Sequence, residues 1–177
     1  MADSLSDVFL SLLNVSPVSR IRRNHGLEHA TLHVLADCQP RRPLAGHSDL
    51  SGFWIIGDLS ADEVQVAVRE ALGRLRNGER DLAVHPNCGT NFATSGLLAG
   101  GAAALSMLGG GRRWRDKLDR IPLAITLATL ALIIAQPLGL LLQEKVTTSG
   151  DPENLEVVEI ISQDRGRIKA HRIVTQG

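Results

Sequence analysis

The 177-residue chain has few aromatic residues and no net charge. It holds three Phe, two Trp and no Tyr, and its 19 basic side chains balance 19 acidic ones. A protein that stacks nucleotide bases needs aromatic platforms, and a nucleic-acid binder needs a basic surface, so we exclude nucleic acid as a partner. The two cysteines, Cys38 and Cys88, allow one disulfide at most. Their number does not show whether the protein lies in an oxidising or a reducing compartment.

The zero net charge is a sum over three unlike segments. Residues 1–90 carry 9 basic and 11 acidic side chains, residues 91–143 carry 5 and 2, and residues 144–177 carry 5 and 6. All seven charges of the middle segment lie between Arg112 and Arg120. We therefore divide the chain into a soluble N-terminal part, an apolar insertion and a C-terminal part with these boundaries.

The apolar insertion predicts a transmembrane hairpin of two helices. Residues 121–143 run for 23 residues without a charge, and about 20 apolar residues span a bilayer. Residues 92–108 are shorter but also uncharged, and Gly96 and Gly100 have the spacing that lets membrane helices approach closely. Oligomerisation through these glycines is a further expectation. The alternatives are a buried core helix for residues 121–143 and a soluble Gly/Ala-rich helix for residues 92–108.

A hairpin puts both ends of the chain on the same side of the cytoplasmic membrane, with the lipid bilayer as a partner. The first 90 residues contain no cleavable signal, which makes export of a folded N-terminal domain difficult. Five basic residues in the linker between the two helices favour the opposite orientation. We expect the soluble part on the cytoplasmic side.

The remaining segments predict a small α+β domain with a short antiparallel sheet, built from both sides of the insertion. We expect helices over residues 4–13, 19–37 and 61–76, a loop over 38–49, and strands over 52–59, 155–162 and 167–175. Ser60 and Glu63 have capping-box spacing at the start of a helix. Asp164 to Gly166 should form the turn of the C-terminal hairpin. Because a lone hairpin is barely stable, it should pack back on the N-terminal part.

Three of the six histidines lie on the helix predicted over residues 19–37. His25 and His29 are four residues apart and project from one face of a helix, with Glu28 on the same side. This is the H-x-x-E-H pattern of inverted zincins, in which the histidines hold Zn²⁺ and the glutamate is the general base. His33 lies about 12 Å from His25 along the helix axis, so it is a third ligand, a supporting group or a bystander.

The third ligand is expected from a polar cluster just before the first apolar helix. His85 and Cys88 are residue types that bind zinc, and Asn87 and Asn91 are further candidates for a ligand or a supporting role. The alternatives are a turn that begins the following helix for this cluster, and a solvated polar helix face for the H-x-x-E-H residues.

Together, the two clusters resemble the YqhQ-like family of uncharacterised bacterial membrane proteins, in which HGxEHxT is followed by HPxCGT and by membrane helices. The matching residues are His25, Gly26, Glu28, His29 and Thr31, and then His85, Pro86, Cys88, Gly89, Thr90 and Phe92. The resemblance covers roughly residues 22–110 and is closer still to a smaller related family of unknown function. The N-terminal part of the YqhQ-like pattern is missing, and the C-terminal strands have no counterpart. The resemblance implies that the two clusters form one site, without naming a reaction.

The sequence supports three hypotheses of function. The first is a membrane-anchored, zinc-dependent, peptidase-like hydrolase that acts on a peptide or protein substrate at the membrane surface. The second is a non-enzymatic scaffold or assembly factor whose His, Glu and Cys clusters are structural. The third is a metal-storage or metal-sensing module. His47 and His171 have no spacing relation to the other histidines and are expected at the surface.

Overall fold

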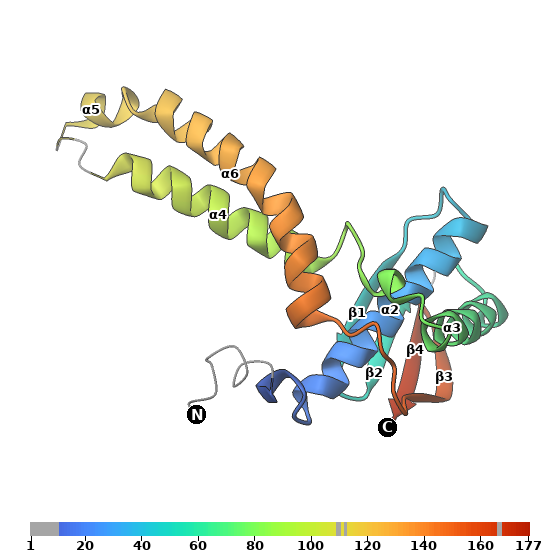
Figure 1. The fold of residues 1–177 in the computed structure, drawn as a ribbon. Coiled ribbons are helices and arrows are strands. Elements are labelled where there is room, and N and C mark those ends of the chain that lie inside the picture. Colours follow the sequence, from blue (N-terminus) through green and yellow to red (C-terminus); the bar gives the residue numbers. More distant parts are fainter. Residues whose placement is uncertain (1–10, 109–110, 112, 166–167) are drawn as a thin grey trace, which may run out of the picture. The chain divides into compact units, whose positions relative to one another are not determined.

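A computed structural model describes residues 11–108, 111, 113–165 and 168–177 (Figure 1). The chain forms two units, and the first is discontinuous in sequence. This sheet unit comprises the chain up to His85 and again from Glu144 to the C-terminus, and the helical unit comprises Pro86–Gln143. The chain thus leaves the sheet unit once and returns to it once.

The sheet unit contains a four-stranded antiparallel sheet with the strand order β1-β2-β4-β3. Its strands are β1 (Ala45–Asp49), β2 (Gly52–Ile56), β3 (Glu156–Arg165) and β4 (Ile168–Gln176). The central pair joins β2, which precedes the helical unit in sequence, to β4, which follows it. This confirms the predicted α+β class with an antiparallel sheet.

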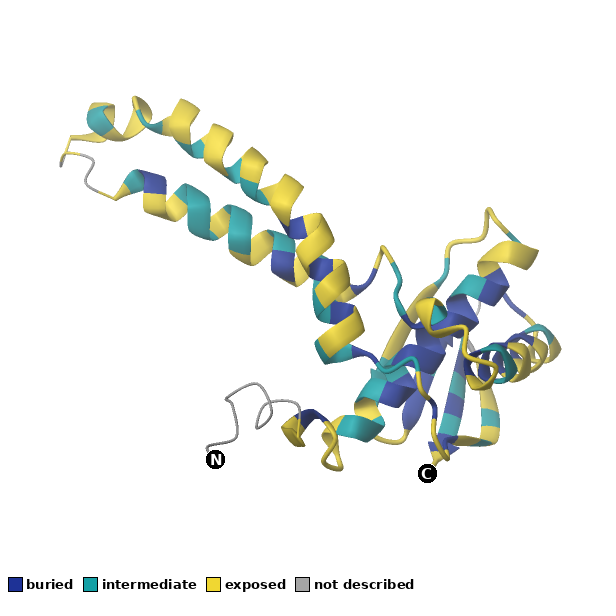
Figure 2. Ribbon diagram, viewed as in Figure 1, coloured by how far each residue is buried: buried dark blue, intermediate teal, exposed yellow. Residues whose placement is uncertain are grey.

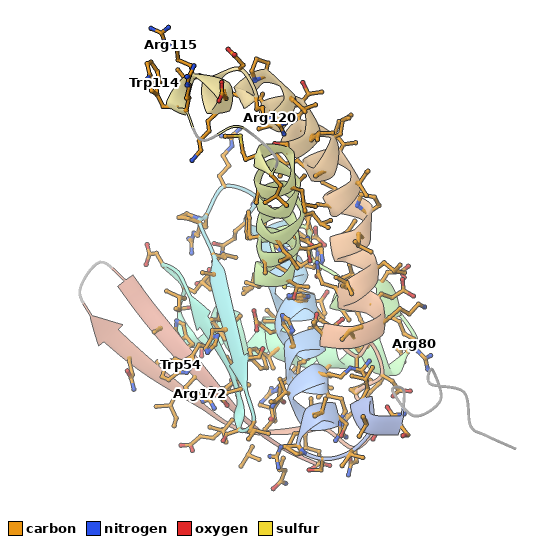
Figure 3. All side chains as sticks on the ribbon, turned by 90° about the vertical axis from the view of Figure 1, so that its left-hand side faces the viewer. Trp54, Arg80, Trp114, Arg115, Arg120 and Arg172 are labelled. Carbon is orange, nitrogen blue, oxygen red and sulfur yellow. The ribbon has the colours of Figure 1, made fainter. Side chains whose placement is uncertain are left out.

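Two helices cover one face of this sheet, namely α2 (Val18–Cys38) and α3 (Ala61–Arg76) (Figure 1). The core between them is made of aliphatic side chains and Phe53, and its fully buried members are Leu27, Ala30, Phe53, Ile55, Val64, Val68, Ala71, Leu155 and Ile173. On the other face, Arg172 lies beside Trp54, with its guanidinium carbon 5.4 Å from the ring centroid (Figure 3). Arg172 also bonds Asp49 at 2.7 Å. The helix-facing side of the sheet is therefore fully buried at Phe53, Ile55 and Ile173 in the central strands, and partly buried at Val157 and Ile160 in β3.

The middle of helix α2, residues 23–35, is buried or half-buried on every side, whereas its two ends are more exposed (Figure 2). Its buried polar residues make hydrogen bonds, as burial of polar groups requires. The amide of Asn24 donates to the carbonyl of Asp49 at 2.8 Å, and Thr175 donates to the Asn24 Oδ1 at 2.7 Å. Thr31 donates to the carbonyl of Leu27 within the helix. Glu28 and His29 of the H-x-x-E-H pattern are 4% and 2% exposed, so the alternative of a solvated helix face is wrong for these two residues.

The sequence-based boundaries of α2 and α3 hold, and the predicted capping box is present. The Ser60 hydroxyl accepts from the Glu63 amide, and the Glu63 carboxylate accepts from the Ser60 amide. The Ser60 amide, followed by the side-chain amide of Gln39 and the Ser60 hydroxyl, lowers the pKa of the Glu63 carboxyl to about 2.

The expected loop over residues 38–49 is wrong at its end, because residues 45–49 form β1. The segment AGHSD has no β-branched or aromatic residue, so its strand depends on pairing with β2 rather than on propensity.

Strand β2 ends at Ile56 instead of residue 59. Asp164 and Arg165 belong to β3 and pair with β4 rather than forming the turn, and Gly166 lies outside the described residues. Most of the helix expected over residues 4–13 also lies outside them.

His171 was expected at the surface and is buried, with 2% of its surface exposed. Its Nε2 donates to the carbonyl of Leu59 at 3.1 Å, and Ser162 donates to its Nδ1 at 2.8 Å. His171 thus connects β3 and β4 to the segment that leads into α3.

The helical unit contains α4 (Gly89–Met107), α5 (Trp114–Leu118) and α6 (Ile121–Leu142), and a π-helical turn, η2 (Gln143–Thr147), follows. Helices α4 and α6 pack against each other along their length (Figure 1). At one end, Gly139 allows the approach of Asn91, which a Cβ would block, and Gln143 donates to Asn91 at 2.7 Å. At the other end of the helix pair, Arg120 donates to the carbonyls of Ser106 and Leu108; Figure 3 labels this arginine.

Most large apolar side chains of this unit are exposed (Figure 2). Among the residues that the structure describes, one helical run, Trp114–Thr147, is long and apolar enough to cross a membrane, with 34 residues. A Cβ built on Gly96 or Gly100 meets nothing within 4 Å, so these glycines do not make the contact between α4 and α6. Oligomerisation through them stays a prediction.

Ser60→Ala should lower the free energy of unfolding of the sheet unit by about 1 kcal/mol, because α3 loses its N-cap. Urea denaturation of the full chain in detergent measures this loss by fluorescence, with Trp114 replaced by Phe throughout so that Trp54 is the reporter. Ser60→Asp, which keeps a capping oxygen, is the control and should stay within a few tenths of a kcal/mol of the original chain. Equal losses in both variants would contradict the cap.

Candidate metal centre

Two chain segments pack on α2 where its histidines lie, and both connect the sheet unit to the helical unit. The outgoing segment is η1 (Arg80–Ala83) with Val84 and His85, and the returning segment spans residues 144–150. The Ser149 amide donates to the carbonyl of Arg22 at 2.9 Å. Gly26 is required here, because a Cβ at this position would overlap the Ser149 carbonyl. The Arg22 guanidinium donates to the carbonyls of Lys145 and Thr148, which fixes the returning segment.

Four imidazoles lie next to one another in the sheet unit, and we call them the histidine row. The ring centroids of His25 and His29 are 4.4 Å apart, those of His29 and His85 are 5.7 Å apart, and those of His85 and His33 are 5.0 Å apart. One ring nitrogen of His25 lies within 4.8 Å of one of His29. The sequence therefore predicted correctly that the two histidine clusters meet, and His33 also belongs to this group.

Backbone carbonyls fix the rings of the three histidines on α2. His25 donates Nδ1–H to the carbonyl of Thr147 at 3.0 Å, and His29 donates Nδ1–H to the carbonyl of Ala83 at 2.8 Å. Because a carbonyl can only accept, the basic nitrogen of each neutral ring is Nε2. His33 donates Nε2–H to the carbonyl of Val84 at 2.9 Å, which makes its Nδ1 the basic nitrogen. Histidines that bind metals commonly donate their other N–H in this way.

His85 is held in the neutral form. Burial is the main cause that lowers its pKa to about 4, and the neighbouring His29 and His33 lower it further. A histidine must be neutral to bind a metal ion, so His85 is a competent donor at neutral pH.

Glu28 is 4% exposed and contacts β1. The Ser48 hydroxyl donates to its carboxylate, and Gly46 leaves room for it, since a Cβ there would overlap the carboxylate oxygen. Burial raises the pKa of Glu28, while the Ser48 bond and the nearby His25 and His47 act in the opposite direction. Gly46 and Ser48 are residues of the site that the sequence reasoning missed, because their segment reads as a loop.

The residues after His85 start the helical unit. Cys88 is the N-cap of α4, and its sulfur accepts from the Thr90 amide at 3.4 Å. Asn91 donates to the carbonyl of Pro86 at 2.7 Å, and Asn87 lies between these residues in sequence. The expected helix-initiating turn is thus present, and metal ligation by Cys88, Asn87 or Asn91 stays a prediction. Cys38 carries a free, exposed thiol, so it forms no disulfide.

Residues 20–160 match a domain of unknown function, DUF6391. The match includes the four histidines of the histidine row and both connecting segments. The chain belongs to the DUF6391 family. An uncharacterized protein of Picosynechococcus sp. is 38% identical to this DUF6391 protein over 152 residues, which cover 79% of this chain and 71% of the relative. No solved structure matches the chain. The expectation of a family of unknown function is confirmed, and the likeness to YqhQ-like proteins stays a prediction.

In the metal-free protein, the free energy of unfolding should fall as the pH decreases from about 6.5 to about 4. His85 takes up a proton near pH 6.5 when unfolded but only near pH 4 when folded, so acid in this window favours the unfolded chain. Urea denaturation across this range measures the slope. His85→Gln removes this titrating group and should give a shallower slope, and an identical slope would contradict a lowered pKa at His85.

Proposed function

We propose that this DUF6391 protein is a membrane protein whose sheet unit binds one zinc ion through His25, His29 and His85. The observation that carries the proposal is the histidine row, with its rings oriented by backbone carbonyls. Imidazole nitrogens bind Zn²⁺ at about 2.0–2.1 Å, which puts two ligand nitrogens about 3.3 Å apart in tetrahedral geometry. One ring nitrogen of His25 lies within 4.8 Å of one of His29, so the pair would have to close by up to about 1.5 Å to reach this spacing.

The donor set has the chemistry of a zinc site with three protein ligands. Three imidazoles leave a fourth position of a tetrahedral ion for water or substrate, and zinc acidifies a bound water. From the sequence, Cys88 is the alternative occupant of that fourth position, since it follows His85 by three residues. With Cys88 bound, the centre would store or sense metal rather than catalyse a reaction.

Hydrolysis of a peptide or protein substrate is the finer part of the proposal, with Glu28 as the general base. Its raised pKa supports this role, because a base that works near neutral pH needs a pKa close to the working pH. The Ser48 hydroxyl would hold the carboxylate in place. The same contact supports the second candidate, a scaffold in which Glu28 and the imidazoles are structural groups with satisfied hydrogen bonds.

We further propose that α4 and α6 both lie in the cytoplasmic membrane, with the sheet unit on the cytoplasmic side. Support comes from the many exposed aliphatic side chains of this unit, which include Leu97, Ile125, Ile133 and Ile134. An apolar surface of this extent needs lipid or a partner to cover it. Because α6 is long enough to cross, α4 packed along it would cross with it.

Zinc titration of the metal-stripped full chain in detergent tests the metal site. We expect one tight equivalent per chain. His25→Gln and His29→Gln should each weaken binding by more than the 10–100-fold that loss of a supporting group causes. His47→Gln, an exposed histidine outside the row, is the control and should bind as the original chain does. Unchanged affinity in a folded His25→Gln variant would contradict the site.

Glu28→Gln separates the enzyme from the scaffold. An amide keeps an acceptor for Ser48 and avoids burying a charge, so the free energy of unfolding should change by less than about 1 kcal/mol. Zinc-dependent cleavage of a quenched-fluorescent peptide library should be lost, whereas Glu70→Gln on α3, the matched control, should cleave normally. Undiminished cleavage by Glu28→Gln would contradict the base, and no cleavage by the zinc-loaded original chain would favour the scaffold.

Arginine substitution in α6 tests the membrane assignment. Ile133 and Ile134 are 63% and 61% exposed near the middle of α6, where each arginine should cost about 2.5–3.5 kcal/mol of insertion. The double variant should move from the carbonate-resistant membrane fraction to the extracted or aggregated fraction. Ile161→Arg, at an exposed position of β3, should stay in the membrane. Extraction of the unmodified chain by carbonate would contradict the assignment.

A further inference from the structure

The histidine row contains one more imidazole than the proposed zinc site uses. His33 follows His29 by one helical turn, which is the same spacing that separates His25 from His29. The ring of His85 lies between the two turns, with its centroid 5.7 Å from that of His29 and 5.0 Å from that of His33. The ring of His85 is therefore nearer to the ring of His33, which the proposed zinc site does not use, than to the ring of His29, which it does use.

The ring of His33 is oriented as a donor. Its Nε2–H donates to the carbonyl of Val84, the residue directly before His85. This bond fixes the ring against the segment that carries His85, and a metal ion would bind at Nδ1. His33 and His85 each keep part of their surface exposed, as His25 does, whereas His29 is 2% exposed. Solvent can therefore reach the two rings that would hold the second ion.

We propose that His33 and His85 form a second metal position, adjacent to the His25–His29 pair, for a divalent ion of the borderline class such as Zn²⁺, Co²⁺ or Cu²⁺. This inference rests on the proposed function, because His85 is shared with the zinc site. Imidazole suits these metals, and two imidazoles with water make a weaker site than three. A neutral imidazole has one lone pair, so to serve both ions His85 would release its remaining ring N–H proton to solvent and bridge them as an imidazolate, and the second ion therefore binds less tightly than the first. The two positions are about one helical turn, roughly 5–6 Å, apart along α2.

The test is a Zn²⁺ titration of the metal-stripped full chain in detergent against a chromophoric chelator, repeated with single variants. The original chain should bind two equivalents, the second at least about tenfold more weakly than the first. His33→Gln should lose the weak equivalent and keep the tight one. His25→Gln should lose the tight equivalent and keep a weak one, and His47→Gln should keep both.

A second measurement does not depend on a variant that folds. With two equivalents of Cu²⁺ bound, the electron paramagnetic resonance spectrum of the original chain should show dipolar coupling between two nearby ions, and with one equivalent it should not. Melting temperatures of the variants show which of them are folded and enter the comparison.

The outcomes separate this inference from the proposed function. One equivalent in the original chain, lost in His25→Gln and kept in His33→Gln, overturns the second position and leaves the zinc site intact. One equivalent lost in both variants also overturns it, because all four imidazoles then serve one ion. No bound metal in the original chain overturns both proposals, and two equivalents with uncoupled Cu²⁺ spectra place the second ion outside the row.

Discussion

The burial of α2 is the constraint on which the rest of the sheet unit depends. The middle of this helix carries Asn, Glu, Thr and three His, and those of them that are buried must have a partner, because an unpaired buried polar group costs about 1–3 kcal/mol. These partners come from every element around the helix. Ser48 on β1 bonds Glu28, and the carbonyls of Ala83, Val84 and Thr147 accept from the imidazoles. The position of β1 and the paths of both connecting segments follow from this requirement.

The same constraint explains how the sheet unit stays compact although a helical insertion interrupts it in sequence. The chain leaves after His85 and returns at Glu144, and both connecting segments are bonded to α2 within a few residues of these points. Strand β4 then pairs with β2, so the sheet joins the chain segments that precede and follow the insertion in sequence. The buried residues of the insertion are small or polar, such as Ala135, Gly139 and Thr94. Many of its large apolar side chains are exposed.

The sequence was informative where local physics decides the structure. Ser60 and Glu63 define the start of α3 by their capping geometry, and the charge-free run after Arg120 defines α6. The H-x-x-E-H spacing and the second histidine cluster led to His25, His29 and His85, which the fold brings together. Tertiary contacts decided the rest. Strand β1 has no strand-forming residue and exists because β2 and α2 hold it, and His171 is buried because Leu59 and Ser162 satisfy both of its nitrogens. The carbonyls that orient the imidazoles belong to the backbone, so the sequence of side chains could not predict these hydrogen bonds.

Glu28 shows most clearly what residue spacing in the sequence can and cannot predict about a site. The spacing put its carboxylate on the side of His25, and the structure adds that Ser48 and Gly46 enclose it. A buried carboxylate with a raised pKa suits a base and also suits a structural acceptor, so the metal decides between the two functions. The account therefore depends on whether the histidine row binds a metal through its imidazoles.

X-ray absorption at the zinc edge of the zinc-loaded full chain tests that claim most directly. We expect a first shell dominated by nitrogen at about 2.0–2.1 Å, with the outer-shell scattering that imidazole rings produce. A sulfur contribution at about 2.3 Å would add Cys88 to the ligands. A first shell of oxygen alone, without imidazole scattering, would contradict a metal centre at the histidine row.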